Sequence, residues 1–203
     1  GSNFTMDYLI APGWKWIDGR EAASLFKRLN LMSQSTLLLS GGSLTGLLEA
    51  TGKSSVDVEI RRHETYKIDK DEADYLGISI SQEAIARDVW LTQDKKRLVY
   101  AHSVFPLSGL DRHVLERISG SIEPLARSLT LEGLQTFKDR LEICAVQCRK
   151  VNNELNLPPE AILWARHYRL LAKTPSDGKD IIASVTEIFS NEIAGNPPQI
   201  TLV

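Results

Sequence analysis

The sequence contains few of the residues and patterns that identify several common protein classes. It has only two cysteines among 203 residues, Cys144 and Cys148, and neither a CxxC pair nor a nearby histidine pair accompanies them. A metal site is therefore not indicated, and we interpret both cysteines as reduced thiols. Hydrophobic runs are short, as in TLLLS at 36–40, whereas a membrane-spanning helix needs roughly 20 apolar residues. We expect no membrane span.

The balance of charge excludes a further set of partners. The chain has 24 Lys and Arg residues against 26 Asp and Glu residues, which gives a formal net charge of -2. Because there is no basic field, we expect neither nucleic acid nor an anionic membrane as a partner. The first residues lack the charged-then-apolar pattern of a secretory signal peptide, so the cytoplasm is the expected compartment.

Motifs of cofactor-dependent and hydrolytic enzymes are also missing. SGGS at 40–43 lacks the Gly-Lys-Ser/Thr that completes a phosphate-binding loop. There is no G-x-S-x-G, the motif that places a nucleophilic serine on a strand-to-helix turn. We therefore expect no nucleotide cofactor and no metal ion, and the sequence does not indicate an oligomeric state.

The residues that are present indicate one globular domain over 1–203. Apolar residues make up 42% of the chain and charged residues 25%, which is typical of a protein that buries a core. Apolar and polar residues alternate, or strand-forming residues gather, in the segments 55–68, 84–92, 97–105, 162–172 and 180–189. DKK at 94–96 forms the turn of a hairpin. The order of the segments predicts an α+β fold whose central antiparallel sheet is covered by helices.

Helices are predicted between and before these strands. Apolar residues recur at helical spacing in 18–32, in 40–52 after a Ser43 cap, and in a helical stretch from about 111 to 155 that includes 124–130. The longest helix candidate is 131–155, and its pattern would place Cys144 and Cys148 on one face.

Three charged residues fall in the apolar registers of predicted strands: Arg62, Arg87 and Glu187. Each could lie at a frayed strand end on the surface. Together, two cations and one anion could neutralise one another as a buried structural pair. They could also line a cavity for a small anionic, hydroxylated ligand, because the planar guanidinium of arginine binds a carboxylate through two parallel hydrogen bonds. The pattern alone leaves these alternatives open.

A series of short motifs, in order, resembles the chorismate pyruvate-lyase family, including its divergent bacterial branch that makes 4-hydroxybenzoate. The resemblance covers roughly residues 40–190. The matching pieces are SLT at 43–45, IRR at 60–62, ARDVWL at 86–91 followed by FPLSGL, PLARSLT at 124–130, LWARHYRL at 163–170 and VTEIF at 185–189.

The resemblance implies a set of site residues. Arg87 and Glu187 match the family's ligand contacts, and we take them as the candidate catalytic residues. Leu44 matches an apolar contact in the early helix, Leu129 a leucine whose backbone is the expected contact, and Arg62 a basic position. There are two departures, Ala126 where glycine is usual and the long predicted helix 131–155, and both bear on the shape of the lid and on substrate preference.

The function that the resemblance implies is conversion of chorismate to 4-hydroxybenzoate and pyruvate without a metal or cofactor, supplying a quinone or another phenolic pathway. The alternative is a non-catalytic domain that binds an aromatic or carboxylate effector, because the same fold resembles the effector-binding domains of some bacterial transcription regulators. Those regulators join the fold to a DNA-binding winged helix, and the roughly 40 residues before the matching part are too few and too neutral for that. A third alternative is a structural ion pair in a protein with another task.

Overall fold

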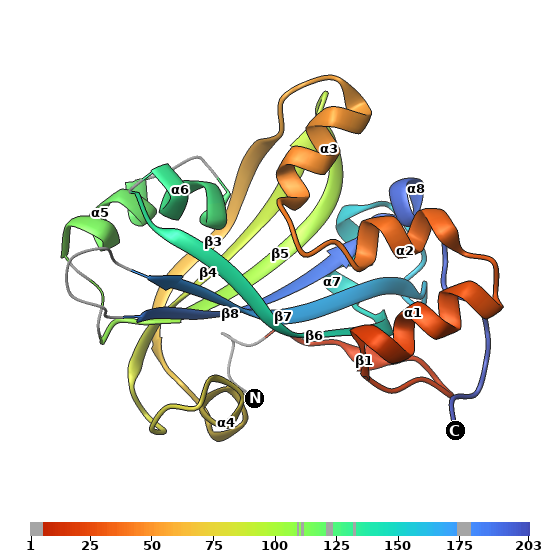
Figure 1. Ribbon diagram of the computed structural model, residues 1–203, viewed down its shortest axis with the longest axis horizontal. Coiled ribbons are helices and arrows are strands. Elements are labelled where there is room, and N and C mark those ends of the chain that lie inside the picture. The colour runs from red at the N-terminus through yellow and green to blue at the C-terminus, as the bar shows by residue number, and fades with distance from the viewer. Residues whose placement is uncertain (1–5, 109, 111, 121–123, 132, 174–179) are drawn as a thin grey trace.

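A single antiparallel sheet organises the molecule (Figure 1). The structure, a computed structural model, describes residues 6–108, 110, 112–120, 124–131, 133–173 and 180–203. The strand order is β1-β6-β7-β8-β5-β4-β3, and β2 also pairs with β6. The strands are β1 (Leu9–Ile10), β2 (Ile17–Asp18), β3 (Asp57–Lys67), β4 (Glu83–Gln93), β5 (Lys96–Pro106), β6 (Gln135–Gln147), β7 (Leu163–Lys173) and β8 (Asp180–Phe189).

Helices lie at both ends of the sheet and over its faces. In Figure 1, α1, α2 and α8 group at one end, α5 and α6 at the other, α3 rises above the middle strands, and α4 lies below them. The helices are α1 (Gly19–Arg28), α2 (Met32–Leu38), α3 (Leu44–Gly52), α4 (Lys70–Leu76), α5 (Arg112–Gly120), α6 (Leu125–Leu131), α7 (Arg149–Glu154) and α8 (Asn191–Ala194). No helix of the described residues is long and apolar enough to cross a membrane.

The predicted fold class is confirmed, and the five predicted strands are present as β3, β4, β5, β7 and β8. The hairpin between β4 and β5 turns at Asp94 and Lys95, whose φ angles of 50° and 65° are both positive. This backbone matches the right-handed twist of the two strands, as two-residue hairpin turns require. KTPSDGK at 173–179, whose proline and glycine predict a loop between the last two strands, lies outside the described residues apart from Lys173.

The prediction of one long helix over 131–155 is wrong. Residues 135–147 form β6, the longest strand, and only the short α7 follows it. A bulge between Asp139 and Glu142 hides the strand in the sequence, because Lys138 lies on one face before the bulge and Ile143 lies on the same face after it. The inserted residues therefore interrupt the period of two that would have indicated a strand.

The two cysteines accordingly do not share a helix face. Cys144 lies in β6, and Cys148 is the residue before α7. Both are free and buried, as the interpretation as reduced thiols requires. Burial raises the pKa of the Cys144 thiol to about 11, so both its position and its protonation state fit a packed core residue.

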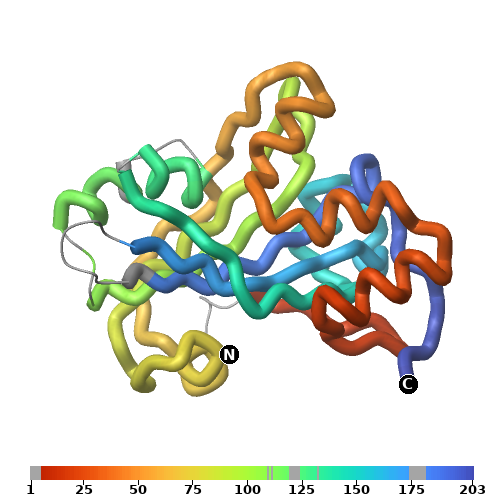
Figure 2. The backbone as a smooth tube through the Cα atoms, viewed as in Figure 1, coloured from red at the N-terminus to blue at the C-terminus, as the bar shows by residue number. Residues whose placement is uncertain are grey.

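Three buried clusters hold the helices to the sheet. The largest includes Phe26 of α1 and Trp164 of β7, whose rings meet edge to face at 5.3 Å. A second cluster packs Ile118 of α5 and Leu129 of α6 against the sheet, and the third holds α4 through residues such as Leu76. Figure 2 shows the last residues of the chain running beside the N-terminal segment, where the Leu202 amide donates to the Gly13 carbonyl at 2.8 Å.

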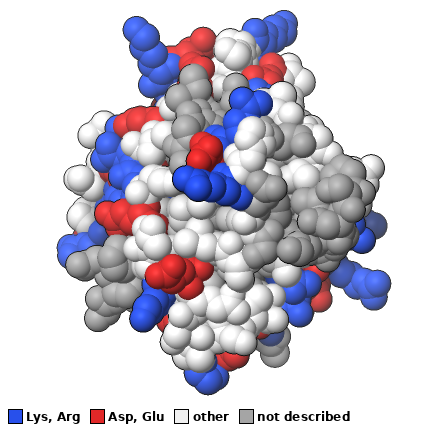
Figure 3. All heavy atoms as spheres, turned by 90° about the vertical axis from the view of Figure 1, so that its left-hand side faces the viewer, with Lys and Arg blue, Asp and Glu red and all other residues white. Residues whose placement is uncertain are grey.

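The surface carries charges of both signs. On the end of the molecule that bears α5 and α6, basic and acidic side chains are interspersed (Figure 3). This agrees with the near-neutral formal charge of the whole chain.

Candidate functional site

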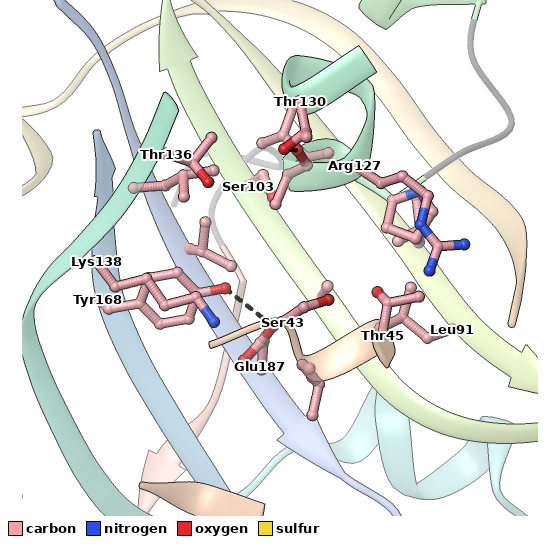
Figure 4. A pocket seen from close by; sticks show the side chains of 18 of the residues that line it. Ser43, Thr45, Leu91, Ser103, Arg127, Thr130, Thr136, Lys138, Tyr168 and Glu187 are labelled. Carbon is pink, nitrogen blue, oxygen red and sulfur yellow. Dashed lines mark hydrogen bonds between the residues drawn. The ribbon is translucent and has the colours of Figure 1, made fainter. Parts of the chain in front are cut away.

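A cavity of about 340 Å³ lies against one face of the sheet. Residues 41–45 and the helix α6 form its cover, and side chains of β4, β5, β6, β7 and β8 form its floor and walls. Figure 4 shows Lys138, Tyr168 and Glu187 together along one side of this cavity and Arg127 on the other. The polar side chains on its lining are Ser43, Thr45, Arg87, Ser103, Arg127, Thr130, Thr136, Lys138, Tyr168 and Glu187.

The cover begins where the chain turns into α3. Ser43 has an extended backbone and its hydroxyl accepts a hydrogen bond from the Gly46 amide at 2.9 Å, so it caps the helix as predicted. The cap fixes the direction in which the next residues leave the loop. Leu44 and Thr45 are both buried and line the cavity.

Glu187 is the carboxylate of the cavity, and two neighbours on β7 hold it. Only 4% of its surface is exposed. Its Oε1 accepts from Arg166 Nε at 2.5 Å, and its Oε2 accepts from the Tyr168 hydroxyl at 3.1 Å. Burial and the charge of Glu187 raise the pKa of Tyr168 well above its ordinary value, so this hydroxyl remains a donor. Both carboxylate oxygens are thus oriented before any ligand arrives.

Arg166 joins Glu187 to the cover. It is fully buried, and its Nη1 donates to the carbonyl oxygens of Leu38 at 3.2 Å and Ser40 at 3.1 Å. Its Nη2 has no hydrogen-bond partner among the described residues. Burial alone would lower the pKa of Arg166, but the adjacent Glu187 charge raises it above its ordinary value. One guanidinium therefore connects the floor of the cavity to the segment that leads into α3.

Arg87 occupies another part of the floor. It lies on β4 opposite Ser103 of β5, and only 2% of its surface is exposed. Burial lowers the pKa of Arg87, but arginine stays charged in proteins. Its strand is separated from that of Glu187 by β5, so the two side chains approach a common space from different sides.

An ion pair links the two halves of the cover. Arg127 Nη2 of α6 lies 2.6 Å from Glu49 Oε1 of α3, and Glu49 Oε2 also accepts from the Val56 amide at 2.9 Å. The hydrogen bonds from Arg127 lower the pKa of Glu49, so the carboxylate is charged at neutral pH. On the far side of the cavity, Lys138 Nζ donates to the Gly42 carbonyl at 2.7 Å.

The structure brings together three of the five candidate residues that the sequence proposed. Arg87, Glu187 and Leu44 line the same cavity. The side chain of Leu129 instead packs into the second core cluster, and its carbonyl accepts from the Leu134 amide at 3.2 Å. Its neighbours in α6, such as Arg127, reach the cavity.

Arg62 lies on the opposite face of the sheet. A bulge between Ile60 and Arg62 changes the register, so Arg62 pairs with Asp88 and not with the cavity-lining Arg87. Arg62 Nη2 lies 3.2 Å from Asp88 Oδ2, which also accepts from the Tyr100 hydroxyl at 2.7 Å. These three residues border a separate hollow of about 630 Å³.

Two residues were missed in the sequence: Arg166, which holds Glu187 from outside the lining, and Lys138, which lines the cavity. Arg166 alternates with Trp164 and Tyr168, so it is a further charged residue in an apolar register, and this signal was sufficient to find it. Lys138 could not be found in that way, because the surrounding segment was assigned to a helix. Among the described residues, no group of three or more His, Cys, Asp or Glu side chains is arranged to hold a metal ion.

Comparison with known families identifies the class of this protein. Residues 38–195 match the family described as "Chorismate pyruvate-lyase Rv2949c-like". The match covers most of the chain, including every described residue that lines the cavity. The chain belongs to this family. A search of curated proteins found no significant match.

Several solved structures have a similar fold. PhnF from Mycobacterium smegmatis superposes with a TM-score of 0.56 at 14% identity, covering 91% of this chain and 88% of PhnF. The effector domain of PhnF from the same organism superposes with a TM-score of 0.53 at 16% identity, covering 74% of this chain and 90% of that domain. A GntR-family transcriptional regulator from Bacillus cereus superposes with a TM-score of 0.51 at 15% identity, covering 73% of this chain and 98% of the regulator. At this identity the likeness establishes the fold alone.

Proposed function

We propose that this protein is a chorismate pyruvate-lyase that converts chorismate to 4-hydroxybenzoate and pyruvate in the cavity under α3 and α6. The observation that carries the proposal is the placement of Arg87 and Glu187, both buried, on the lining of one cavity. Membership of the lyase family over residues 38–195 supports it.

The chemistry of the substrate suits these groups. Chorismate has a ring carboxylate, and on two other, adjacent ring carbons it has an enolpyruvyl ether and a hydroxyl. The guanidinium of Arg87 binds the ring carboxylate, for which its planar geometry is suited. Glu187 accepts a hydrogen bond from the ring hydroxyl, because each carboxylate oxygen has a lone pair beyond those used by Arg166 and Tyr168.

The reaction is an elimination that makes the ring aromatic. The bond between the ring carbon and the ether oxygen breaks, and its electron pair leaves with the enolpyruvyl oxygen. The hydrogen on the hydroxyl-bearing carbon leaves as a proton, and its bonding pair forms the new ring double bond. The leaving group gains a proton at its methylene carbon and becomes pyruvate. The ring proton can reach the leaving group by either of two routes that satisfy this balance. It can pass through Glu187, or it can move directly within the substrate.

The protein contributes orientation and a preorganised electrostatic environment. Fixed charges in a cavity that excludes water stabilise developing charge more than they would in water. The Arg166–Glu187 pair and the Tyr168 hydroxyl keep the acceptor in place without reorganisation during the reaction. The ring carboxylate on Arg87 then sets the position of the ether bond relative to Glu187.

A second candidate function is binding of an aromatic or carboxylate effector without turnover. The regulators that share this fold include one solved as an effector domain. The same cavity and the same two residues would serve it, because Arg87 and Glu187 bind a hydroxylated aryl carboxylate whether or not it reacts.

Incubation with chorismate separates the two functions. The lyase releases pyruvate and 4-hydroxybenzoate in equal amounts, each measured independently. Binding of 4-hydroxybenzoate without release of either product from chorismate would favour the effector function. Pyruvate without 4-hydroxybenzoate would indicate a different aromatic product.

A further inference from the structure

Lys138 is a cation inside the cavity to which neither the sequence nor the proposed reaction assigns a role. It lies on β6, is half-buried, and lines the cavity beside Tyr168 (Figure 4). Its Nζ is 5.0 Å from the centroid of the Tyr168 ring and donates to the Gly42 carbonyl at 2.7 Å. Lys138 forms no ion pair with the residues that the structure describes.

The electrostatic surroundings of Lys138 favour an anion. Burial and the nearby Arg166 guanidinium lower the pKa of Lys138, and the charge of Glu187 opposes them only in part. The Glu187 carboxylate is already bound by Arg166 and Tyr168. A carboxylate brought in by a ligand would therefore be the close counter-charge that Lys138 lacks among the described residues.

The formal charges of the residues around the cavity also favour an anionic ligand. Among the described residues, its lining has three cations, Arg87, Arg127 and Lys138, and one anion, Glu187. Outside the lining, Glu49 balances Arg127, and Arg166 balances Glu187. Lys138 is therefore a cation of this lining without a carboxylate partner among the described residues, and an anionic group of a ligand would complement it.

Arg87 and Lys138 reach the cavity from different parts of the sheet. Strands β5, β8 and β7 separate β4 from β6. With strands spaced about 4.8 Å apart, the two backbones are about 19 Å from each other along the curled sheet. The two cations therefore approach the cavity from opposite directions along the sheet, as groups that bind two ends of one ligand would.

We propose that Lys138 binds a second carboxylate of the ligand, so that the cavity selects dicarboxylates over monocarboxylates of the same size. If the protein is the proposed lyase, the second carboxylate is that of the enolpyruvyl substituent. Only this identification of the carboxylate rests on the proposed function. Arg87 and Lys138 then hold the two ends of chorismate and fix the ether bond between them. The ammonium group has three donors, so one can remain on the Gly42 carbonyl.

The proposal has a consequence for product release. After the ether bond breaks, 4-hydroxybenzoate retains only the ring carboxylate and loses the contact with Lys138. The charge of Lys138 is then no longer compensated by the ligand, so the affinity for the product is lower than the affinity for the substrate. Lys138 also donates to the Gly42 carbonyl of the cover. The side chain that loses its carboxylate when pyruvate leaves is therefore the one that binds the cover.

The test compares two unreactive ligands by calorimetry. 3-(Carboxymethoxy)-4-hydroxybenzoate has both carboxylates, and 4-hydroxy-3-methoxybenzoate has a ring carboxylate and a neutral ether. The wild type should bind the dicarboxylate more tightly. Lys138→Met should lower that affinity about tenfold or more, the effect of losing one charge-assisted hydrogen bond, and leave the affinity for the monocarboxylate within about twofold. Lys138→Arg should restore much of the preference.

The matched control is Lys70→Met, which removes an exposed lysine paired with Asp74 on α4, outside the cavity lining. It should bind both ligands like the wild type. Equal loss for the two ligands in Lys138→Met, or no preference in the wild type, would overturn the proposal. If Lys138→Met does not fold, the wild type is titrated to alkaline pH instead. Affinity for the dicarboxylate alone should then fall as Lys138 loses its proton, and parallel curves would overturn the proposal.

The outcome does not depend on catalysis. If chorismate is not converted but the dicarboxylate preference depends on Lys138, the lyase proposal fails and this inference stands. If chorismate is converted and Lys138→Met has the parental Michaelis constant and dicarboxylate affinity, the lyase proposal stands and this inference fails.

Discussion

Arg166 Nε of β7 lies 2.5 Å from Glu187 Oε1 of β8, and both side chains are buried. The two residues are cross-strand partners, since Arg166 pairs with Glu187 in the register of β7 and β8. This pairing explains how a carboxylate occupies the apolar register of a strand: a cation on the next strand compensates its charge, while its second oxygen receives the Tyr168 hydroxyl. The pair is structural, and its carboxylate is also part of the cavity wall.

The Arg166–Glu187 pair should therefore be important for stability. Arg166→Met leaves a buried carboxylate without its cation, and removing one partner of a buried pair costs about 3–5 kcal/mol. The free energy of unfolding, measured by urea denaturation at pH 7, should fall by that amount. Removing both charges in Arg166→Met/Glu187→Leu should recover a large part of it.

The control for this prediction is Arg112→Met, which removes the cation of an exposed pair with Glu116 on α5. Exposed pairs contribute little, and we expect a change within about 0.5 kcal/mol. An Arg166→Met variant as stable as Arg112→Met would contradict the role given to the buried pair.

Arg87→Lys should weaken ligand binding without unfolding the protein. Lysine keeps the positive charge but loses the two-pronged geometry, and one lost charge-assisted hydrogen bond lowers affinity about tenfold. Calorimetry with 4-hydroxybenzoate measures the effect directly. Arg97→Lys, which alters an arginine paired with Glu59 outside the cavity lining, should bind like the wild type. Equal affinities in the two variants would remove Arg87 from the site.

The ion pair between Arg127 and Glu49 should control how fast a ligand leaves. It joins α6 to α3 over the cavity. Arg127→Met separates the two halves of the cover, so the dissociation rate of 4-hydroxybenzoate, followed by stopped-flow fluorescence, should rise several-fold. Lys70→Met, which breaks a pair on α4, should leave that rate unchanged. If Arg127→Met releases the product no faster than Lys70→Met, the cover does not depend on this contact.

Asp88 on the opposite face should contribute stability that depends on pH. Burial alone would raise the pKa of Asp88, but hydrogen bonds from His102 and Tyr100 and the charge of Arg62 hold it below its ordinary value. A carboxyl with a depressed pKa stabilises the fold above its unfolded pKa of about 3.9 and ceases to do so as the pH falls through its folded pKa. Asp88→Asn should cost about 3 kcal/mol at pH 7.

The gap in unfolding free energy between wild type and Asp88→Asn should narrow below about pH 4, since the Asp88 carboxyl of the unfolded chain is protonated there first and the folded carboxyl follows at lower pH. Urea denaturation at pH 7 and pH 3 measures both points. A gap of constant size over this range would show that Asp88 acts through packing and not through its charge.

The sequence predicted the strands that alternate without interruption and failed where a bulge changes the period. The bulge at Arg140 and Leu141 moves the cavity-facing positions of β6 from even to odd numbers, and the bulge at Arg61 moves Arg62 to the other face. Arg140 has a φ of 54° although it is not a glycine, so the residue type gives no signal of the bulge.

The alternation of apolar and polar residues also could not predict which cation pairs with Glu187. The apolar register shows that Glu187 needs a cation, but only the strand order shows which one it meets. Arg166 lies on the strand next to β8, whereas Arg87 lies two strands away. Ion-pair partners across a sheet depend on this order, and alternation within a strand contains no information about it.

The central claim is that the Arg87 and Glu187 cavity converts chorismate, and steady-state kinetics of the wild type beside Glu187→Gln tests it most directly. Release of pyruvate and 4-hydroxybenzoate is followed at a series of chorismate concentrations, with folding checked by thermal melts. Glutamine keeps the shape of Glu187 but removes its charge and its capacity to accept a proton, so kcat should fall by a larger factor than KM changes. A folded wild type that releases neither product, or a folded Glu187→Gln with parental kcat and KM, would contradict the claim.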